Sequence, residues 1–303
     1  MEAVLIKSFT FLSIVLLGYI LKTKNFFKKE DSQLISKIVS RITLPCAVLG
    51  SAVQLTFTQV TIIVMVVAIV TDLIMGLVGK LTFLNKSHIE RASAITNTSG
   101  YNVANVTIPF VQSFFPGVGM GYVCMFDIGN SIGWLGLTVA WGKSEADENA
   151  KFSIKHLINT LLHSIPFLTY ILIFTLGVLK LSLPAPIASI VTTIGSANSF
   201  LVMLMIGMMI DFKMTKEQFI SVFKIVGLRL AGFIVFSIVI IFLLPDPMLA
   251  KTVLLLCIVP SAPSISIVFS KELGDESAIP AFINSISLLL GIVCSTIVLL
   301  FSV

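Results

Sequence analysis

Ten apolar stretches, each close to the length of a membrane-spanning helix, recur along this chain of 303 residues. An α-helix needs about 20 mostly apolar residues to cross roughly 30 Å of hydrocarbon. The stretches lie approximately at 3–21, 34–53, 59–80, 90–113, 118–141, 158–180, 186–210, 219–244, 248–269 and 277–301. The longest connection, near 142–157, is too short for a soluble domain. The pattern predicts an all-α, multi-pass integral membrane protein with a single transmembrane domain over 1–303.

Composition supports a lipid environment and argues against several function classes. Hydrophobic residues make up 56% of the chain and charged residues 12%, which is about half the charged share of a soluble domain. The net charge of +5 needs no nucleic-acid partner, because basic connections that face anionic lipid account for it. The motifs of hydrolases, zinc proteases and nucleotide-binding enzymes are absent, and the four cysteines stand singly in apolar stretches. We therefore expect no enzyme, no cofactor and no metal site.

The basic residues predict which side of the membrane each connection faces. Except for Lys7, Lys180 and Lys251, all 20 lie in or beside the odd-numbered connections. The connections at 54–58 and 114–118 carry none. Cytoplasmic connections are the ones enriched in Lys and Arg. We therefore expect a cell-membrane protein with cytoplasmic odd-numbered connections and both termini extracellular.

Ten spans divide into two halves of five, at about 1–145 and 155–303. Because each half has an odd number of spans, the second half begins on the opposite side of the membrane and is inverted relative to the first. Pro109 is followed 21 residues later by Asn130-Ser131-Ile132, and Pro263 is followed 21 residues later by Asn284-Ser285-Ile286. Both pairs lie in matching spans, the fourth and fifth and the ninth and tenth. Inverted repeats with interrupted helices are typical of secondary transporters.

The fourth span is too polar for a helix that faces lipid. Asn97, Asn102 and Asn105 precede Pro109, together with threonines, a serine and Gly100. Proline removes a backbone donor and clashes with the preceding turn, so we expect this helix to break near Pro109. Side-chain amides beside the break can either satisfy the backbone or bind a ligand. A simple proline kink is the alternative interpretation.

The ninth span predicts a second break, because Pro260 and Pro263 lie three residues apart and Ser264 follows. If the fourth and ninth helices cross at their breaks, two half-helix N-termini meet near the bilayer centre. Each carries a partial positive charge of roughly half an elementary charge. Such a site favours an anion.

Ionisable residues inside spans are the other functional candidates, since burying a charge in lipid is costly. Asp127 lies in the fifth span, three residues before Asn130, and is a candidate proton carrier. Asp72 lies in the third span, where a structural pairing with a neighbouring helix is equally compatible. Arg229 lies near the cytoplasmic end of the eighth span, where a snorkelling side chain is the simpler interpretation.

Several segments resemble the auxin efflux carrier family. The segment from Asn102 to Pro109 resembles the family's Asn-x-Gly-x-x-Gly-x-Pro stretch in the fourth helix, and Asp127-Ile128-Gly129-Asn130 resembles its fifth-helix Asp-x-Gly-Asn. Pro260-Ser261-Ala262-Pro263 and Val268–Glu272 resemble its ninth helix. The resemblance extends over essentially the whole chain, including the short central connection of bacterial members.

The resemblance implies a carrier of small organic anions, since bacterial members are associated with malate and malonate and plant members with auxin. It also implies the bile acid–sodium symporter fold, in which a core of helices 3–5 and 8–10 moves against a panel of helices 1, 2, 6 and 7. By position, the substrate would be bound by residues of the crossing, with coupling residues beside it. The substrate set is Asn102, Asn105, Pro109, Pro260, Pro263 and Ser264. The coupling candidates are Asp127, Asn130, Asn284 and Asp72.

Three departures from the family pattern bear on the pocket. Ala104 and Thr107 stand where the family usually has glycine, and Phe200 stands where the seventh helix usually has proline. A sodium-coupled carrier of a bulkier anion, with Asp127, Asn130 and Asn284 as sodium ligands, is the main alternative to a proton-coupled carrier. A non-transporting membrane sensor or scaffold is the alternative from another class, and a homodimer is compatible with either.

Overall fold

The structure is a computed structural model that describes residues 1–28, 30–51, 58–147, 153–210, 214–244 and 248–302. Every regular element in these ranges is a helix, so the prediction of an all-α protein is confirmed for them. Six helical segments are long and apolar enough to cross a membrane. They are α1 (Glu2–Thr23), α4 (Gln59–Thr82), α7–η3–α8 (Val118–Asn130, Ser131–Thr138, Val139–Ala146), α11–α12 (Ala185–Ser196, Asn198–Met209), α13 (Lys216–Leu243) and α16 (Ile279–Ser302).

The remaining helices are shorter and fall in the other four predicted spans, where the helix is interrupted or changes type. They are α2 (Asp31–Ile38), η1 (Val39–Thr43) and α3 (Leu44–Ser51); α5 (His88–Thr98), η2 (Val103–Thr107) and α6 (Ile108–Phe114); α9 (Ile154–Leu162) and α10 (Ile165–Val178); and α14 (Met248–Cys257) and α15 (Ser266–Glu272). The elements labelled η are π-helical turns. Within the described residues, six candidate membrane spans are compatible with a membrane protein, and the count of ten stays a prediction.

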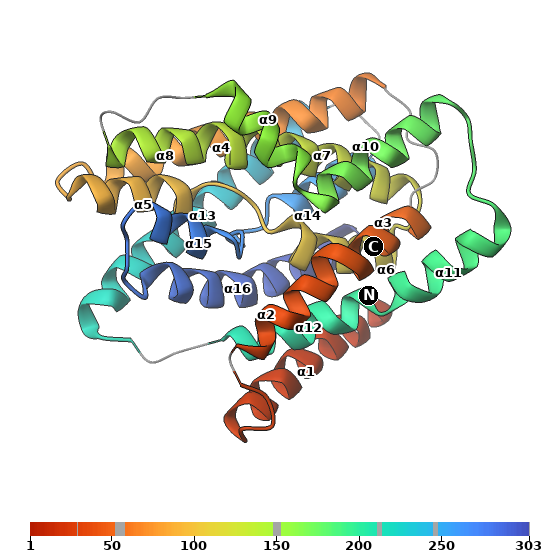
Figure 1. Cartoon of the computed structure of the whole chain (residues 1–303), viewed down its shortest axis with the longest axis horizontal. Coiled ribbons are helices and arrows are strands. Elements are labelled where there is room, and N and C mark those ends of the chain that lie inside the picture. Colours follow the sequence, from red (N-terminus) through yellow and green to blue (C-terminus); the bar gives the residue numbers. More distant parts are fainter. Residues whose placement is uncertain (29, 52–57, 148–152, 211–213, 245–247, 303) are drawn as a thin grey trace.

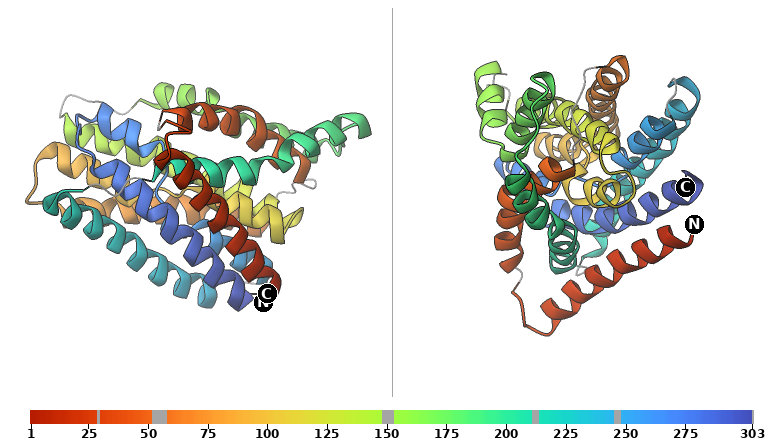
Figure 2. Two further views of the ribbon diagram at one scale, coloured as in Figure 1. Left: turned by 90° about the horizontal axis from the view of Figure 1, so that it is seen from below. Right: turned by 90° about the vertical axis from the view of Figure 1, so that its right-hand side faces the viewer.

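The helices pack in two groups (Figures 1 and 2). In one group, α4 packs against α5, α7 and η3, and α14 packs against α7 and α16. In the other, α1 packs against α12, and α3 packs against α10 and α11. Glycines allow the closest approaches. A methyl group on Gly129 of α7 would lie only 2.2 Å from the Met65 carbonyl oxygen. A methyl group on Gly207 of α12 would lie only 2.0 Å from the Val15 carbonyl oxygen.

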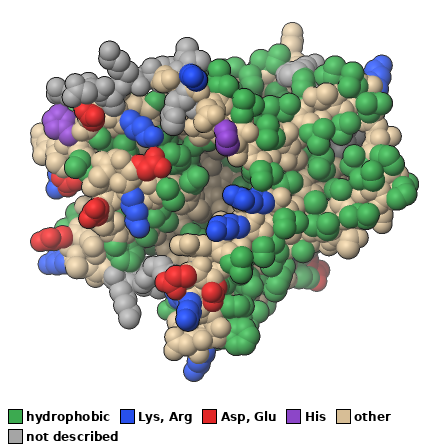
Figure 3. Space-filling view, viewed as in Figure 1, with side chains coloured by type: hydrophobic (Ala, Val, Ile, Leu, Met, Phe, Trp, Pro, Cys, Tyr) green, Lys and Arg blue, Asp and Glu red, His purple; other side chains and the backbone are tan. Residues whose placement is uncertain are grey.

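Charged side chains gather at one end of the molecule, over the ends of α5 and α8 (Figure 3). Glu145 of α8 is central to this region. Its carboxylate lies 2.7 Å from Lys80 Nζ of α4 and 2.8 Å from Arg91 Nε of α5. Lys80 and Arg91 belong to the connection that the sequence predicts to be cytoplasmic. The ion pairs therefore tie three helices together at that end.

The two chain termini lie close together in every view (Figures 1 and 2).

Candidate functional site

The first interruption lies between α5 and η2, at residues 99–102. Gly100 has φ +76°, in the left-handed region that glycine adopts without strain. A methyl group there would also lie 2.4 Å from the Trp134 ring. Trp134 in turn donates from Nε1 to the Thr96 carbonyl at 2.9 Å. The chain therefore breaks at a glycine that packing and backbone conformation both require.

The interruption that the sequence predicts in the fourth span is present, but it lies at residues 99–102 rather than at Pro109. Pro109 is buried in the first turn of α6, where its missing N–H costs little. The π-helical turn η2 comes immediately before α6. A π-turn shifts hydrogen bonding from i→i+4 to i→i+5, which accommodates a residue that cannot donate. The sequence signal was the proline, but the actual break lies several residues earlier.

The second interruption covers residues 258–265, between α14 and α15, and contains Pro260 and Pro263 as predicted. The two interruptions meet near the middle of the molecule (Figure 1). The Asn102 backbone N–H donates to the Ser261 carbonyl at 3.0 Å. This hydrogen bond joins segments about half the chain apart, so the predicted contact between the two breaks is present.

Three of the predicted substrate-binding residues lie together at this contact. Asn102 Nδ2 donates to the Ala262 carbonyl at 2.8 Å and to Ser264 Oγ at 3.0 Å. Asn105 Nδ2 donates to the same Ser264 oxygen at 3.3 Å. Asn102 is buried, whereas Asn105 and Ser264 are half-buried. The other three predicted residues, all prolines, are buried and shape the backbone. The cluster of Asn102, Asn105 and Ser264 is termed the polar cluster below.

Arg229 of α13 does not snorkel, so that interpretation is wrong. Its side chain is 3% exposed. Nη1 donates to the carbonyls of Asn97, Thr98 and Ser99 at 3.1, 2.9 and 3.0 Å. Nη2 donates to the carbonyls of Gly100 and, at 2.7 Å, Ser261. The guanidinium therefore caps the C-terminal end of α5, which carries partial negative charge, and joins it to the second interruption.

Asp72 of α4 also binds Gly100, but at its N–H rather than at its carbonyl. Its Oδ1 accepts from the Gly100 N–H at 3.1 Å, and the side chain is fully buried. Asp72 Oδ2 has no hydrogen-bond partner among the described residues. Asp72 and Arg229 therefore bind opposite sides of Gly100, one at its N–H and the other at its carbonyl. This structural use agrees with the pairing interpretation of Asp72.

Asn130 of α7 satisfies the next residue of the first interruption. Its Oδ1 accepts from the Tyr101 N–H at 3.0 Å, and its Nδ2 donates to the Tyr101 carbonyl at 3.2 Å and to Asp127 Oδ1 at 3.0 Å. Asp127 Oδ2 accepts from the Tyr170 hydroxyl of α10 at 2.7 Å. Buried backbone groups almost always find partners, and here the sequence candidates Asp72 and Asn130 are among them.

Asn284 does not repeat the role of Asn130, although the two occupy matching positions in the sequence. Asn284 is buried in α16, and its Oδ1 has no partner among the described residues. The N–H of Ala262 in the second interruption is instead bound by Ser287 Oγ at 3.0 Å. The two breaks are therefore satisfied by different side chains.

Sequence reasoning offers no ground to single out Trp134 or Tyr170, and it marks Thr107 only as a departure from the family pattern. Thr107, which stands where the auxin efflux carrier family usually has glycine, donates from Oγ1 to the Leu256 carbonyl near the end of α14 at 2.9 Å. That departure was the only available signal for it. Nothing in the local sequence distinguishes Trp134 or Tyr170 from other aromatic residues in apolar helices.

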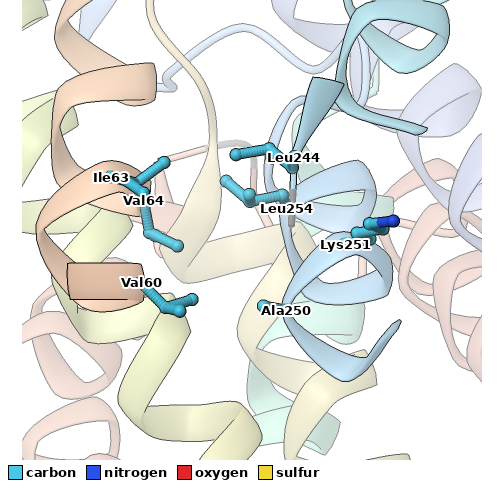
Figure 4. Close-up of a pocket in the computed structure, with 7 residues that line it drawn as sticks. All are labelled: Val60, Ile63, Val64, Leu244, Ala250, Lys251 and Leu254. Carbon is cyan, nitrogen blue, oxygen red and sulfur yellow. The ribbon is translucent and has the colours of Figure 1, made fainter. Parts of the chain in front are cut away.

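Two hollows in the described structure have mostly apolar linings, and neither is lined by a residue of the polar cluster. A pocket between α4 and α14, drawn in Figure 4, has a volume of about 10 Å³ and is lined mostly by aliphatic side chains such as Val64 and Leu254. A groove of about 480 Å³ runs along α4 and α13, with an almost wholly aliphatic lining that suits lipid chains. The face in Figure 3 is hollowed near its middle, with Lys and Arg side chains at the rim.

The described residues contain no group of three or more His, Cys, Asp or Glu side chains arranged to hold a metal ion. No family model matches the chain, and no curated protein matches it in sequence.

Proposed function

We propose that this protein is a secondary carrier of small organic anions, with carboxylates such as malate or malonate as the substrate class. The observation that carries the proposal is the meeting of two interrupted helices, at which side-chain amides and a hydroxyl converge. Interrupted helices are costly in a membrane and are typical of transporter binding sites.

The polar cluster supports a carboxylate ligand. The amides of Asn102 and Asn105 each supply N–H donors, and the hydroxyl of Ser264, which now accepts from both, can rotate to donate. The turn that follows Asn102 adds backbone N–H groups at a helix start, where partial positive charge favours an anion. No buried lysine is needed. Asn105 and Ser264 are half-buried, so part of each residue is exposed.

The proposed architecture has ten spans in two inverted halves, made from the six long helical segments and four interrupted ones. The core would hold α4–α8 and α13–α16, and the panel would hold α1–α3 and α9–α12. The packing of α4 with α7 and of α1 with α12 supports this division. Alternating access would come from movement of the core against the panel.

Proton coupling is proposed at Asp127, a buried acid whose described partners, Tyr170 and Asn130, are both neutral. The test is uptake of labelled malate into proteoliposomes, in sodium-free buffer, with and without an inward proton gradient. We expect saturable uptake that the gradient stimulates. Asp127→Asn should bind malate but lose the stimulation. Gradient-driven uptake that is identical in wild type and Asp127→Asn would remove Asp127 from the mechanism.

Sodium coupling is the second candidate, favoured by the buried and unpartnered Oδ1 of Asn284. Amide and carboxylate oxygens suit a hard cation. Uptake that appears only after sodium is added, and that Asn284→Ala weakens at low but not at saturating sodium, would favour this candidate over proton coupling.

A further inference from the structure

A continuous chain of hydrogen bonds links α10 to the first interruption. It begins at the Tyr170 hydroxyl, passes through both oxygens of Asp127 to the Asn130 amide, and ends on the N–H and carbonyl of Tyr101. Tyr101 is the residue next to Asn102 of the polar cluster. Every side chain in this chain is buried, so bulk water does not compete with its bonds.

This series of hydrogen bonds connects the two groups of helices. Its Tyr170 end lies on α10, which packs mainly against α3, α9 and η1. Its Asp127 and Asn130 end lies on α7, which packs mainly against α4, η3 and α14. The 2.7 Å hydrogen bond from Tyr170 is therefore a polar bond between groups that must slide past each other if alternating access operates.

An ionised Asp127 makes this bonding strongest, because a charge-assisted hydrogen bond is about twice as strong as a neutral one. Each carboxylate oxygen accepts one hydrogen bond, from Tyr170 Oη and from Asn130 Nδ2. A protonated carboxyl gains an O–H donor, and the Tyr170 hydroxyl can accept as well as donate. A proton on Oδ2 would therefore reverse the bond with Tyr170 and leave it neutral and weaker, whereas one on Oδ1 would face the Asn130 amide hydrogens. Because Asn130 is also bound to both backbone groups of Tyr101, the bond with Tyr170 is the one that protonation weakens with least rearrangement.

The surroundings contain no cation that would hold Asp127 ionised. The titratable groups that face it are Tyr170 of α10, Cys124 of α7, Cys257 of α14 and Asp72 of α4. No Lys, Arg or His in the described part of the chain forms an ion pair with Asp127. The only buried arginine close to Asp72, Arg229, is used by backbone carbonyls.

We propose that Tyr170 is the coupling residue of the carrier: its charge-assisted hydrogen bond to ionised Asp127 holds α10 to α7, and proton binding at Asp127 weakens it. The inference rests on the proposed transport function. It assigns a role to a tyrosine outside the substrate site, and makes the movement of one helix group against the other depend on a proton.

The test compares Tyr170→Phe with Tyr122→Phe. Tyr122 is a tyrosine on α7 itself, 8% exposed, that forms no hydrogen bond among the described residues, so its variant controls for the removal of a tyrosine hydroxyl as such. The first readout is amide hydrogen exchange of α7 and α10 in detergent at pH 5 and pH 8, corrected for the intrinsic effect of pH. The second is malate uptake with and without an inward proton gradient.

In the wild type and in Tyr122→Phe, we expect faster exchange at pH 5 than at pH 8. Tyr170→Phe should exchange fast at both pH values and lose gradient stimulation of uptake, while malate still shifts its thermal unfolding. Exchange in Tyr170→Phe that keeps the wild-type pH dependence would overturn the inference, even if uptake is proton-driven. The expected exchange pattern without uptake in any variant would instead support the proton-sensitive bond between Tyr170 and Asp127 and reject malate transport as the function.

Discussion

Replacing Arg229 by methionine tests whether this residue holds the two interruptions together. The substitution keeps a long, flexible side chain of similar reach and removes every donor. Four terminal N–H groups of the guanidinium serve five carbonyls, four from residues 97–100 and one from Ser261. All five carbonyls would then lie beside a side chain that cannot donate.

The magnitude follows from the burial of this residue. Hydrogen bonds to charged groups contribute about 1.5–3 kcal/mol each, but in membranes the less folded state also finds partners. Removing one side of a buried charged network costs about 3–5 kcal/mol. At ~2–4 °C per kcal/mol for a domain of comparable size, the unfolding temperature should fall by about 6–20 °C.

The cysteines provide the assay. All four are free, and Cys124, Cys257 and Cys294 are buried. A thiol-reactive dye therefore reports unfolding in detergent, with every variant scanned at one rate because unfolding of such proteins is commonly irreversible. Arg41→Gln, which removes an exposed positive charge from η1, is the matched control and should leave the unfolding temperature unchanged.

Arg229→Lys separates charge from geometry. Lysine keeps the charge but has three donors on one atom instead of a planar fork, so its loss should be intermediate. An Arg229→Met variant that unfolds at the same temperature as Arg41→Gln would refute the reasoning. Full recovery in Arg229→Lys would show that charge, rather than the number of donors, supports the break.

Three further predictions follow from single contacts. Gly100→Ala should lower the free energy of unfolding by more than ~1–2 kcal/mol, which is the cost of the left-handed backbone alone. The loss is larger because the new methyl group also contacts Trp134. A variant as stable as the wild type in the dye assay would contradict this. Glu145→Gln, which leaves two cations unpaired at a partly buried site, should cost about 1–3 kcal/mol, and the loss should shrink as salt is raised. Thr107→Val removes the donor to the Leu256 carbonyl at nearly constant volume, so we expect a loss of about 1–2 kcal/mol, whereas an unchanged unfolding temperature would mean that the carbonyl has another partner.

The class of the protein and the location of its polar centre could be predicted from the printed residues. Apolar stretches of span length require helices, because a helix alone satisfies its own backbone in lipid. Polar residues concentrated in one such stretch require protein partners for the same reason. Asn102, Asn105 and Ser264 could therefore be identified from the sequence alone, and they lie together in the fold. These inferences use hydropathy and spacing, which are local properties of a sequence.

The position of the first break and the partners of the buried charges depend on how the helices pack. Proline marks a possible interruption, but the chain breaks at Gly100, because Trp134 and Arg229 approach the backbone there. Tyr170 and Thr107 acquire roles only because remote segments, α7 and α14, come within hydrogen-bond distance. A buried polar group binds whichever partner the packing brings close, and the spacing of residues along one helix carries no record of that partner on another.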